Sequence, residues 1–122
     1  MILFYIKDSN LCIKEFRYTN KTIKERKILE NVLGNDYCIK IDTKDKFYGI
    51  ASCKGGKVVY MYEDENFNLI TKNLFDYDDE KYLVKNLYIK KYEKNIHIMY
   101  YVQDTNNRKI WHIASHYYDG NN

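Results

Sequence analysis

Residues 42–50, Asp-Thr-Lys-Asp-Lys-Phe-Tyr-Gly-Ile, form a polar turn that leads into an apolar strand, and this pattern decides the fold. It returns 49 residues later at 91–99, Lys-Tyr-Glu-Lys-Asn-Ile-His-Ile-Met, where Ile96 takes the place of Phe47. The opening run 2–6, Ile-Leu-Phe-Tyr-Ile, is similar to the same strand. Self-similarity at a spacing of this size is the sequence signature of a repeat architecture.

Around these stretches the apolar residues recur with a period of two, which is typical of strands. Val58, Tyr60 and Tyr62 alternate with Val59 and Met61. Clusters of Asn, Asp, Gly and Lys separate such runs. The pattern predicts ten strands near residues 2–7, 11–18, 22–29, 36–43, 46–53, 57–63, 68–74, 81–89, 95–103 and 109–116. The run 22–29 also fits a short amphipathic helix closed by Gly34.

The repeat groups these strands in fours. A turn and a second aromatic strand follow each first strand, at 16–18, 60–62 and 111–113. Four antiparallel strands in roughly 46 to 49 residues is the arithmetic of a β-propeller blade. We therefore expect one all-β domain over 1–122, with repeats at about 1–45, 46–94 and 95–122. The alternative is a β-sandwich, which ten strands fill without a partner.

At these residues the chain resembles bacterial β-propeller repeat proteins with sialidase-like or lectin-like blades. The resemblance is carried by the turn-plus-strand units at 46–51 and 95–100 and by 111–121, Trp-His-Ile-Ala-Ser-His-Tyr-Tyr-Asp-Gly-Asn. The sialidase Asp-box, S-x-D-x-G-x-T-W, does not occur in the sequence. The resemblance therefore implies a non-catalytic module, with a glycan as the first expectation for a ligand.

Ten strands make about two and a half blades, whereas a propeller ring needs at least four. Blades cannot bury both faces without neighbours, and open strand edges pair with other chains. We expect a homo-oligomer in which copies complete a ring, with a dimer as the first expectation. The alternatives are a fragment of a longer repeat protein whose only activity is self-association, an enzyme, or a nucleic-acid binder.

Composition supports a globular domain and argues against several other classes. The 122 residues include 14 Tyr, no Pro and 30% charged residues, and the net charge is +3. This weak basic charge argues against nucleic acid as a partner. The short apolar N-terminus has no signal-peptide flanks, and three cysteines without a C-x-x-C pair suit a reducing compartment, so we expect a cytoplasmic protein and no membrane partner. Abundant Lys, Asn, Ile and Tyr indicate a low-GC bacterial or phage source.

The aromatic residues are the candidate ligand-binding residues, because Tyr and Trp offer rigid faces that stack on sugars and on protein surfaces. Tyr60, Tyr62, Tyr100 and Tyr101 lie in the runs with the clearest strand pattern, and Trp111 is the only Trp in the sequence. We single out Trp111, Tyr60, Tyr62 and Tyr100 as the candidate residues. The same residues are favoured in strands by packing alone, so core positions are the competing interpretation.

No catalytic or metal site is expected, and no cofactor. His112 and His116 would lie roughly 13 Å apart on a strand at about 3.3 Å per residue, too far for one metal ion. The cysteines have no neighbouring His in sequence and read as packed thiols. The acidic turns at 63–66 and 76–80 lack a Ca²⁺-loop pattern. An enzyme would need acids such as Asp42, Asp45 and Glu93 to meet in one channel.

Overall fold

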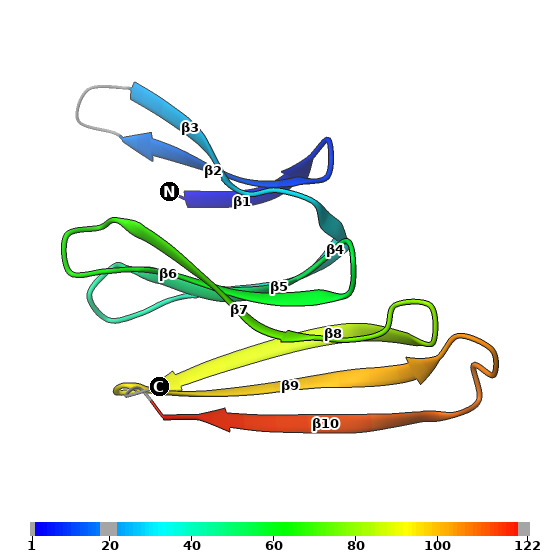
Figure 1. The fold of residues 1–122 in the computed structure, drawn as a ribbon. Helices are drawn as coiled ribbons and strands as arrows, with labels where there is room; N and C mark the ends of the chain where they lie inside the picture. The colour runs from blue at the N-terminus through cyan, green and yellow to red at the C-terminus, as the bar shows by residue number, and fades with distance from the viewer. Residues whose placement is uncertain (1, 18–21, 120–122) are drawn as a thin grey trace.

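The computed structural model describes residues 2–17 and 22–119, and these residues form ten β-strands and no helix (Figure 1). The strands are β1 (Ile2–Lys7), β2 (Asn10–Arg17), β3 (Thr22–Leu29), β4 (Val32–Ile41), β5 (Phe47–Cys53), β6 (Lys57–Glu63), β7 (Leu69–Asp76), β8 (Tyr82–Tyr92), β9 (Asn95–Asp104) and β10 (Trp111–Tyr118). The prediction of an all-β chain is confirmed. The run 22–29 is a strand and not a helix, because β3 is paired along β2.

The strands form three antiparallel sheets, each a meander of consecutive strands. The N-terminal sheet has the order β1-β2-β3, the middle sheet β4-β5-β6-β7, and the C-terminal sheet β8-β9-β10. The division is therefore three, four and three strands. The expected repeat boundaries after residues 45 and 94 fall between β4 and β5 and between β8 and β9, inside the second and third sheets.

Sheets and repeat nevertheless agree in one respect. The repeated strands β5 and β9 each stand second in their sheet. If β1, β5 and β9 are equivalent strands, β4 has a counterpart in β8 but none among the described residues of the N-terminal sheet. Likewise β7 has a counterpart in β3 but none among the described residues of the C-terminal sheet. The two repeated strands also have the same orientation in the stack, since Phe47 and Ile96 each point toward the sheet that precedes their own in the chain.

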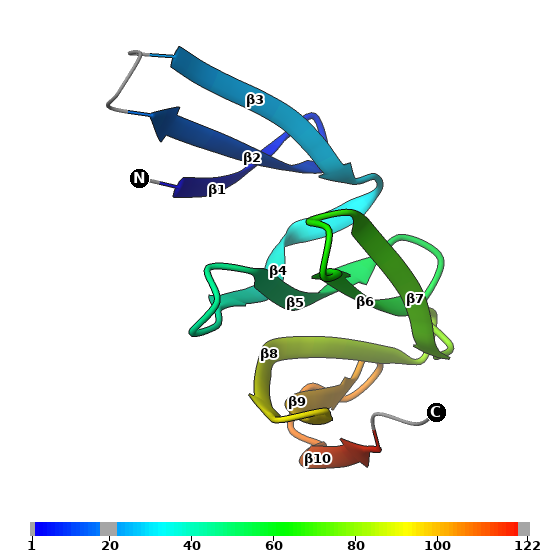
Figure 2. The same cartoon turned by 90° about the vertical axis from the view of Figure 1, so that its left-hand side faces the viewer.

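The three sheets lie in layers, with the middle sheet between the other two (Figures 1 and 2). One core lies between the N-terminal and middle sheets and contains Leu11, Ile13, Phe47 and Met61. The other lies between the middle and C-terminal sheets and is built from ten buried residues: Tyr48, Ile50, Val58, Tyr60, Val84, Leu87, Ile89, Ile96, Ile98 and Tyr100.

Strand β5 contributes to both cores, and all of its seven residues are buried. Its small residues allow this close packing. A Cβ atom on Gly49 would lie 2.7 Å from the backbone oxygen of Cys38 on β4, closer than real Cβ contacts. Ser52, also buried, shares a hydrogen bond of 2.9 Å between its Oγ and the Tyr77 hydroxyl.

The sheets approach one another most closely along one side of the stack. β4 and β5 lie next to β8, and β1 lies next to β4, whereas β7 and β10 make no comparable approach to another sheet within the described residues. The layers therefore converge at β1, β4 and β8 and diverge toward the opposite strands.

The double burial of β5 predicts that Ile50→Ala will lower the free energy of unfolding by about 2–5 kcal/mol, because the cavity lies in a fully packed core. Ile110→Ala is the matched control. Its side chain is 57% exposed in the turn before β10, so its effect should stay within about 0.5 kcal/mol. Urea unfolding of both variants at one protein concentration tests this, and equal effects would contradict the placement of the core.

Candidate functional site

The C-terminal sheet has one covered face and one exposed face, and the exposed face is rich in aromatic side chains. Ile96, Ile98 and Tyr100 point into the core, so the alternate residues of β9 point outward. The pairing register carries the same division to β8 and β10. We call this surface the C-terminal outer face. Its exposed large apolar residues are Tyr88, Tyr92, Met99, Tyr101, Trp111, Ile113 and Tyr117.

These side chains are exposed where the corresponding ones of the middle sheet are covered. The repeat matches Ile50 with Met99, and the ladder then matches Val58 with Ile113. Ile50 and Val58 are fully buried by the C-terminal sheet, whereas Ile113 is 57% exposed. The face has thus kept apolar residues at positions that the middle sheet uses for packing.

The register also matches Tyr62 with Tyr117, which is 65% exposed. This corrects the sequence alignment, which set 60–62 against 111–113. The hairpin between β9 and β10 is longer than that between β5 and β6, so the equivalent residues come later in β10. The β5–β6 ladder ends at the pair Cys53–Lys57, which matches the pair Val102–His112 in the C-terminal sheet. Trp111 pairs with Gln103 one step farther along, where the β5–β6 ladder has no pair.

The polar residues on this face are basic or neutral. The ammonium group of Lys40 lies 3.9 Å from the centre of the Tyr88 ring, and that of Lys90 lies 5.1 Å from the Tyr92 ring. A side-chain hydrogen bond with Tyr92 raises the pKa of Lys90. His97 Nε2 and Ser115 Oγ share a hydrogen bond of 2.5 Å across β9 and β10.

At one end of the face is a shallow hollow of about 340 Å³, lined by Lys85, Asn86, Tyr101, Gln103 and Trp111. The Trp111 and Tyr101 rings meet edge to face, with centroids 5.6 Å apart and planes at 81°. Trp111 is 58% exposed, so most of its indole is available. The Gln103 amide donates to the Arg108 carbonyl at 2.8 Å, which holds that side chain in place.

The four expected ligand-binding residues do not form one site. Tyr60 is 9% exposed and stacks on Tyr62 at 5.2 Å between the middle and C-terminal sheets, where burial raises the pKa of Tyr60 to about 12. Tyr100 is 7% exposed, and its ring packs against those of Phe75 and His116, which also contact each other. Only Trp111 lies on the exposed face.

Sequence reasoning named Tyr101 but not the other large residues of that face, among them Met99, Ile113 and Tyr117. The signal was present, because Met99 and Tyr101 alternate with the core residues of β9. A period of two separates the two rows of a strand but does not tell which row another sheet will cover.

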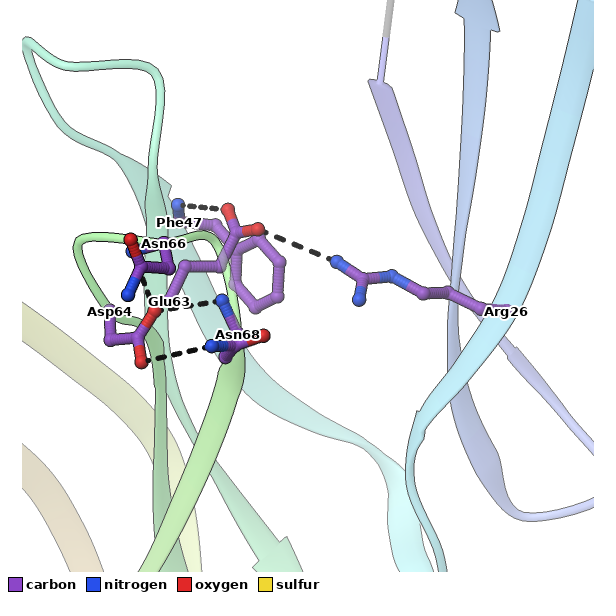
Figure 3. Close-up of polar contacts among 6 residues, drawn as sticks. All are labelled: Arg26, Phe47, Glu63, Asp64, Asn66 and Asn68. Atoms are coloured by element: carbon purple, nitrogen blue, oxygen red, sulfur yellow. Dashed lines mark hydrogen bonds and ion pairs between the residues drawn. The ribbon is translucent and has the colours of Figure 1, made fainter.

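A second cluster of polar contacts joins the N-terminal sheet to the middle sheet (Figure 3). The Glu63 carboxylate accepts from the Phe47 amide at 3.0 Å and pairs with the Arg26 guanidinium at 3.5 Å. Arg26 also lies 5.9 Å from the centre of the Phe47 ring. The Glu63 side chain is only 8% exposed, and the Phe47 amide and the Arg26 guanidinium are two partners of its buried carboxylate. This arrangement links the two sheets through a charged contact between β3 and the end of β6.

Other acidic residues close turns. Asp42 Oδ1 accepts from the backbone amides of Lys44 and Lys46 at 2.9 and 3.0 Å. Asp42 and Glu93 line one hollow at the ends of the strands, whereas Asp45 lines a different one, so the three acids do not meet in one channel. Asp45 and Glu93 have positive φ values of 61° and 56°, as turn residues do.

The histidines and cysteines are placed by packing. His112 and His116 lie on strand β10, and His116 Nε2 shares a hydrogen bond of 2.6 Å with the Tyr100 hydroxyl. Burial raises the pKa of the Cys53 thiol, which disfavours the reactive thiolate. Within residues 2–17 and 22–119, no three His, Cys, Asp or Glu side chains are grouped so as to hold a metal ion.

Comparison with known proteins returns no match to a family model, to a curated protein or to a solved structure. In the part of the chain that the structure describes, no helix has the length and apolar character to cross a membrane.

The turn at 64–68 makes a testable prediction about pH. Hydrogen bonds from Asn68 and Asn66 lower the pKa of Asp64 below 3.8 (Figure 3). Stability from this carboxylate is therefore complete above the unfolded pKa and is lost as the pH falls through the lower folded pKa. Asp64→Asn should unfold with a shallower loss of stability below pH 3.8 than the parent chain. Urea midpoints across this range measure it, and identical slopes would contradict it.

Proposed function

We propose that the chain is a non-catalytic, propeller-like module whose biochemical activity is self-association through the C-terminal outer face. The observation that carries this proposal is the exposure of seven large apolar side chains on one sheet face. Monomeric proteins rarely expose contiguous apolar patches larger than a few hundred Å². A larger patch generally marks an interaction surface.

The type of side chain supports a protein partner. Tyr, Trp and Met are enriched at interface centres, and each aromatic residue buries about 150–250 Å² when covered. The C-terminal outer face carries four tyrosines and Trp111. These residues stand on paired strands and not on loops, so covering them orders little additional backbone.

The layered arrangement supports a propeller-like assembly over a sandwich. A sandwich packs two sheets on one core, whereas this chain stacks three sheets on two cores in chain order. The layers converge at β1, β4 and β8, as blades do around an axis. Sheets that converge on one side and diverge on the other have the shape expected of part of a ring.

The polar groups support a non-catalytic role because their contacts are structural. Glu63 joins two sheets, and Asp42 and Asp64 accept backbone amides in turns. The Cys53 thiol has a raised pKa, and His116 is hydrogen-bonded to a core tyrosine.

Tyr117→Lys tests the proposed surface. A lysine in place of Tyr117 on a covered apolar face would be buried without a partner, so this variant should be monomeric at concentrations where the parent chain is oligomeric. Ile110→Lys is the control, because Ile110 is equally exposed but stands outside the face. Light scattering after size exclusion gives the masses. A parent chain that is monomeric at every concentration would contradict self-association.

The hollow at Trp111 favours glycan binding as a second candidate function. Sugars bind through C–H groups stacked on an aromatic face together with polar side chains at its edge. Trp111 presents its indole beside Tyr101, and Asn86 and Lys85 border the same hollow.

Trp111→Ala should abolish a glycan signal while the chain remains folded, because the indole is 58% exposed. Circular dichroism and a glycan array measure the two properties. Trp111→Phe keeps an aromatic face and should retain part of the signal. Unfolding of the alanine variant would show that the indole serves packing, and an array without any hit would remove the glycan candidate.

A further inference from the structure

We infer that the C-terminal outer face of one copy docks on the outer face of the N-terminal sheet of a second copy, closing a dimeric ring of six sheets. This inference rests on the proposed self-association and specifies its partner surface and its stoichiometry. The docking surface on the N-terminal sheet is the face turned away from the middle sheet, which we call the N-terminal outer face.

The contacts inside the chain provide the pattern. Each core forms between two unlike faces. The face of one sheet that is turned toward the next sheet in the chain packs on the face of that next sheet that is turned back toward it. Between the middle and C-terminal sheets, the backbone amide of Lys91 donates to the Tyr48 hydroxyl at 3.3 Å. The Lys91 ammonium also lies 5.8 Å from the centre of the Tyr48 ring. A tyrosine on one sheet thus meets a lysine on the next sheet.

The two outer faces can repeat that pattern. Phe4 and Ile6 pack inward, so Leu3, Tyr5 and Lys7 lie on the N-terminal outer face. The ladder adds Lys14, Glu25, Ile23 and Lys27 to that face. Leu3 is 50% exposed and Ile23 is 56% exposed. The face therefore offers two aliphatic side chains, Tyr5, Glu25 and three lysines to a partner face that offers four tyrosines, Met99 and Ile113.

The alternative arrangement places two C-terminal outer faces against each other. That pairing gives Lys85 and Lys90 no carboxylate to meet, because the ladder positions of the C-terminal outer face hold none. The N-terminal outer face contributes Glu25 as well as lysines, and lysines over aromatic rings are favourable contacts. Pairing of unlike faces is also the arrangement that both internal layers use.

The number of sheets fixes the number of copies. Closed propellers usually contain about four to eight blades. The chain supplies three sheets, so two copies give six, whereas three copies would give nine. A two-fold axis along the ring relates six sheets without dividing any of them. The apparent two and a half blades of the sequence become three layers because the ten strands divide as three, four and three.

Ring closure leaves the Trp111 hollow at the rim. Trp111 lies one ladder step beyond the positions that the middle sheet buries at its own interface. A docked sheet with the same footprint covers Met99, Ile113 and Tyr117 and stops before the indole.

Two surface variants test the arrangement. Leu3→Lys alters only the N-terminal outer face, and Tyr117→Lys alters only the C-terminal outer face. Unlike pairing predicts that each variant alone is monomeric, with dimerisation weakened by about 30-fold or more, the size of a hot-spot loss. An equimolar mixture should recover dimers, because one interface then joins two unaltered faces. Ile110→Lys should dimerise as the parent chain does.

The outcomes separate the inference from the proposed function. A Leu3→Lys chain that dimerises as tightly as the parent, beside a monomeric Tyr117→Lys chain, would overturn unlike pairing and leave self-association standing. A parent oligomer other than a dimer would overturn closure at six sheets. A parent chain that is always monomeric would overturn both proposals. Sedimentation velocity on the variants and their mixture measures all of these masses.

Discussion

The burial of β5 on both of its faces is the constraint on which the structure depends. All seven residues of this strand are buried, and Phe47 and Ile50 belong to different cores. A strand of this kind cannot lie at the surface of a two-layer protein, because one of its rows would meet water. The middle sheet therefore requires a sheet on each side. The N-terminal and C-terminal sheets supply them.

The same requirement then passes to the outer sheets. Stacked repeats stay soluble as single chains when their terminal units have polar outer faces. The N-terminal outer face approaches this condition with Lys7, Lys14 and Lys27. The C-terminal outer face does not, since Ile113 and Tyr117 are exposed on it. The two ends of the stack are unlike each other, and this difference is what favours contact between unlike faces.

Much of the fold is predictable from the sequence, and the reasons are local. Alternation and turn residues identified all ten strands, and the 49-residue repeat matched Phe47 with Ile96 on the same side of their sheets. The grouping into sheets was not predictable in this way. It depends on which hairpins continue a ladder and where a chain crosses to the next layer, and both are decided by long-range packing. The alternation likewise marked two rows on β9 without showing which one stays exposed.

The abundance of tyrosine follows from the stacking more than from ligand recognition. Tyr48, Tyr60 and Tyr100 fill the space between sheets, and the hydroxyls of Tyr48 and Tyr100 form hydrogen bonds with the Lys91 amide and with His116. Tyr117 occupies the position that Tyr62 holds in the middle sheet. Trp111 is different, because it lies beyond the matched ladder and the middle sheet has no counterpart for it. Stacking between sheets accounts for these buried tyrosines, whereas it does not account for Trp111, which is 58% exposed.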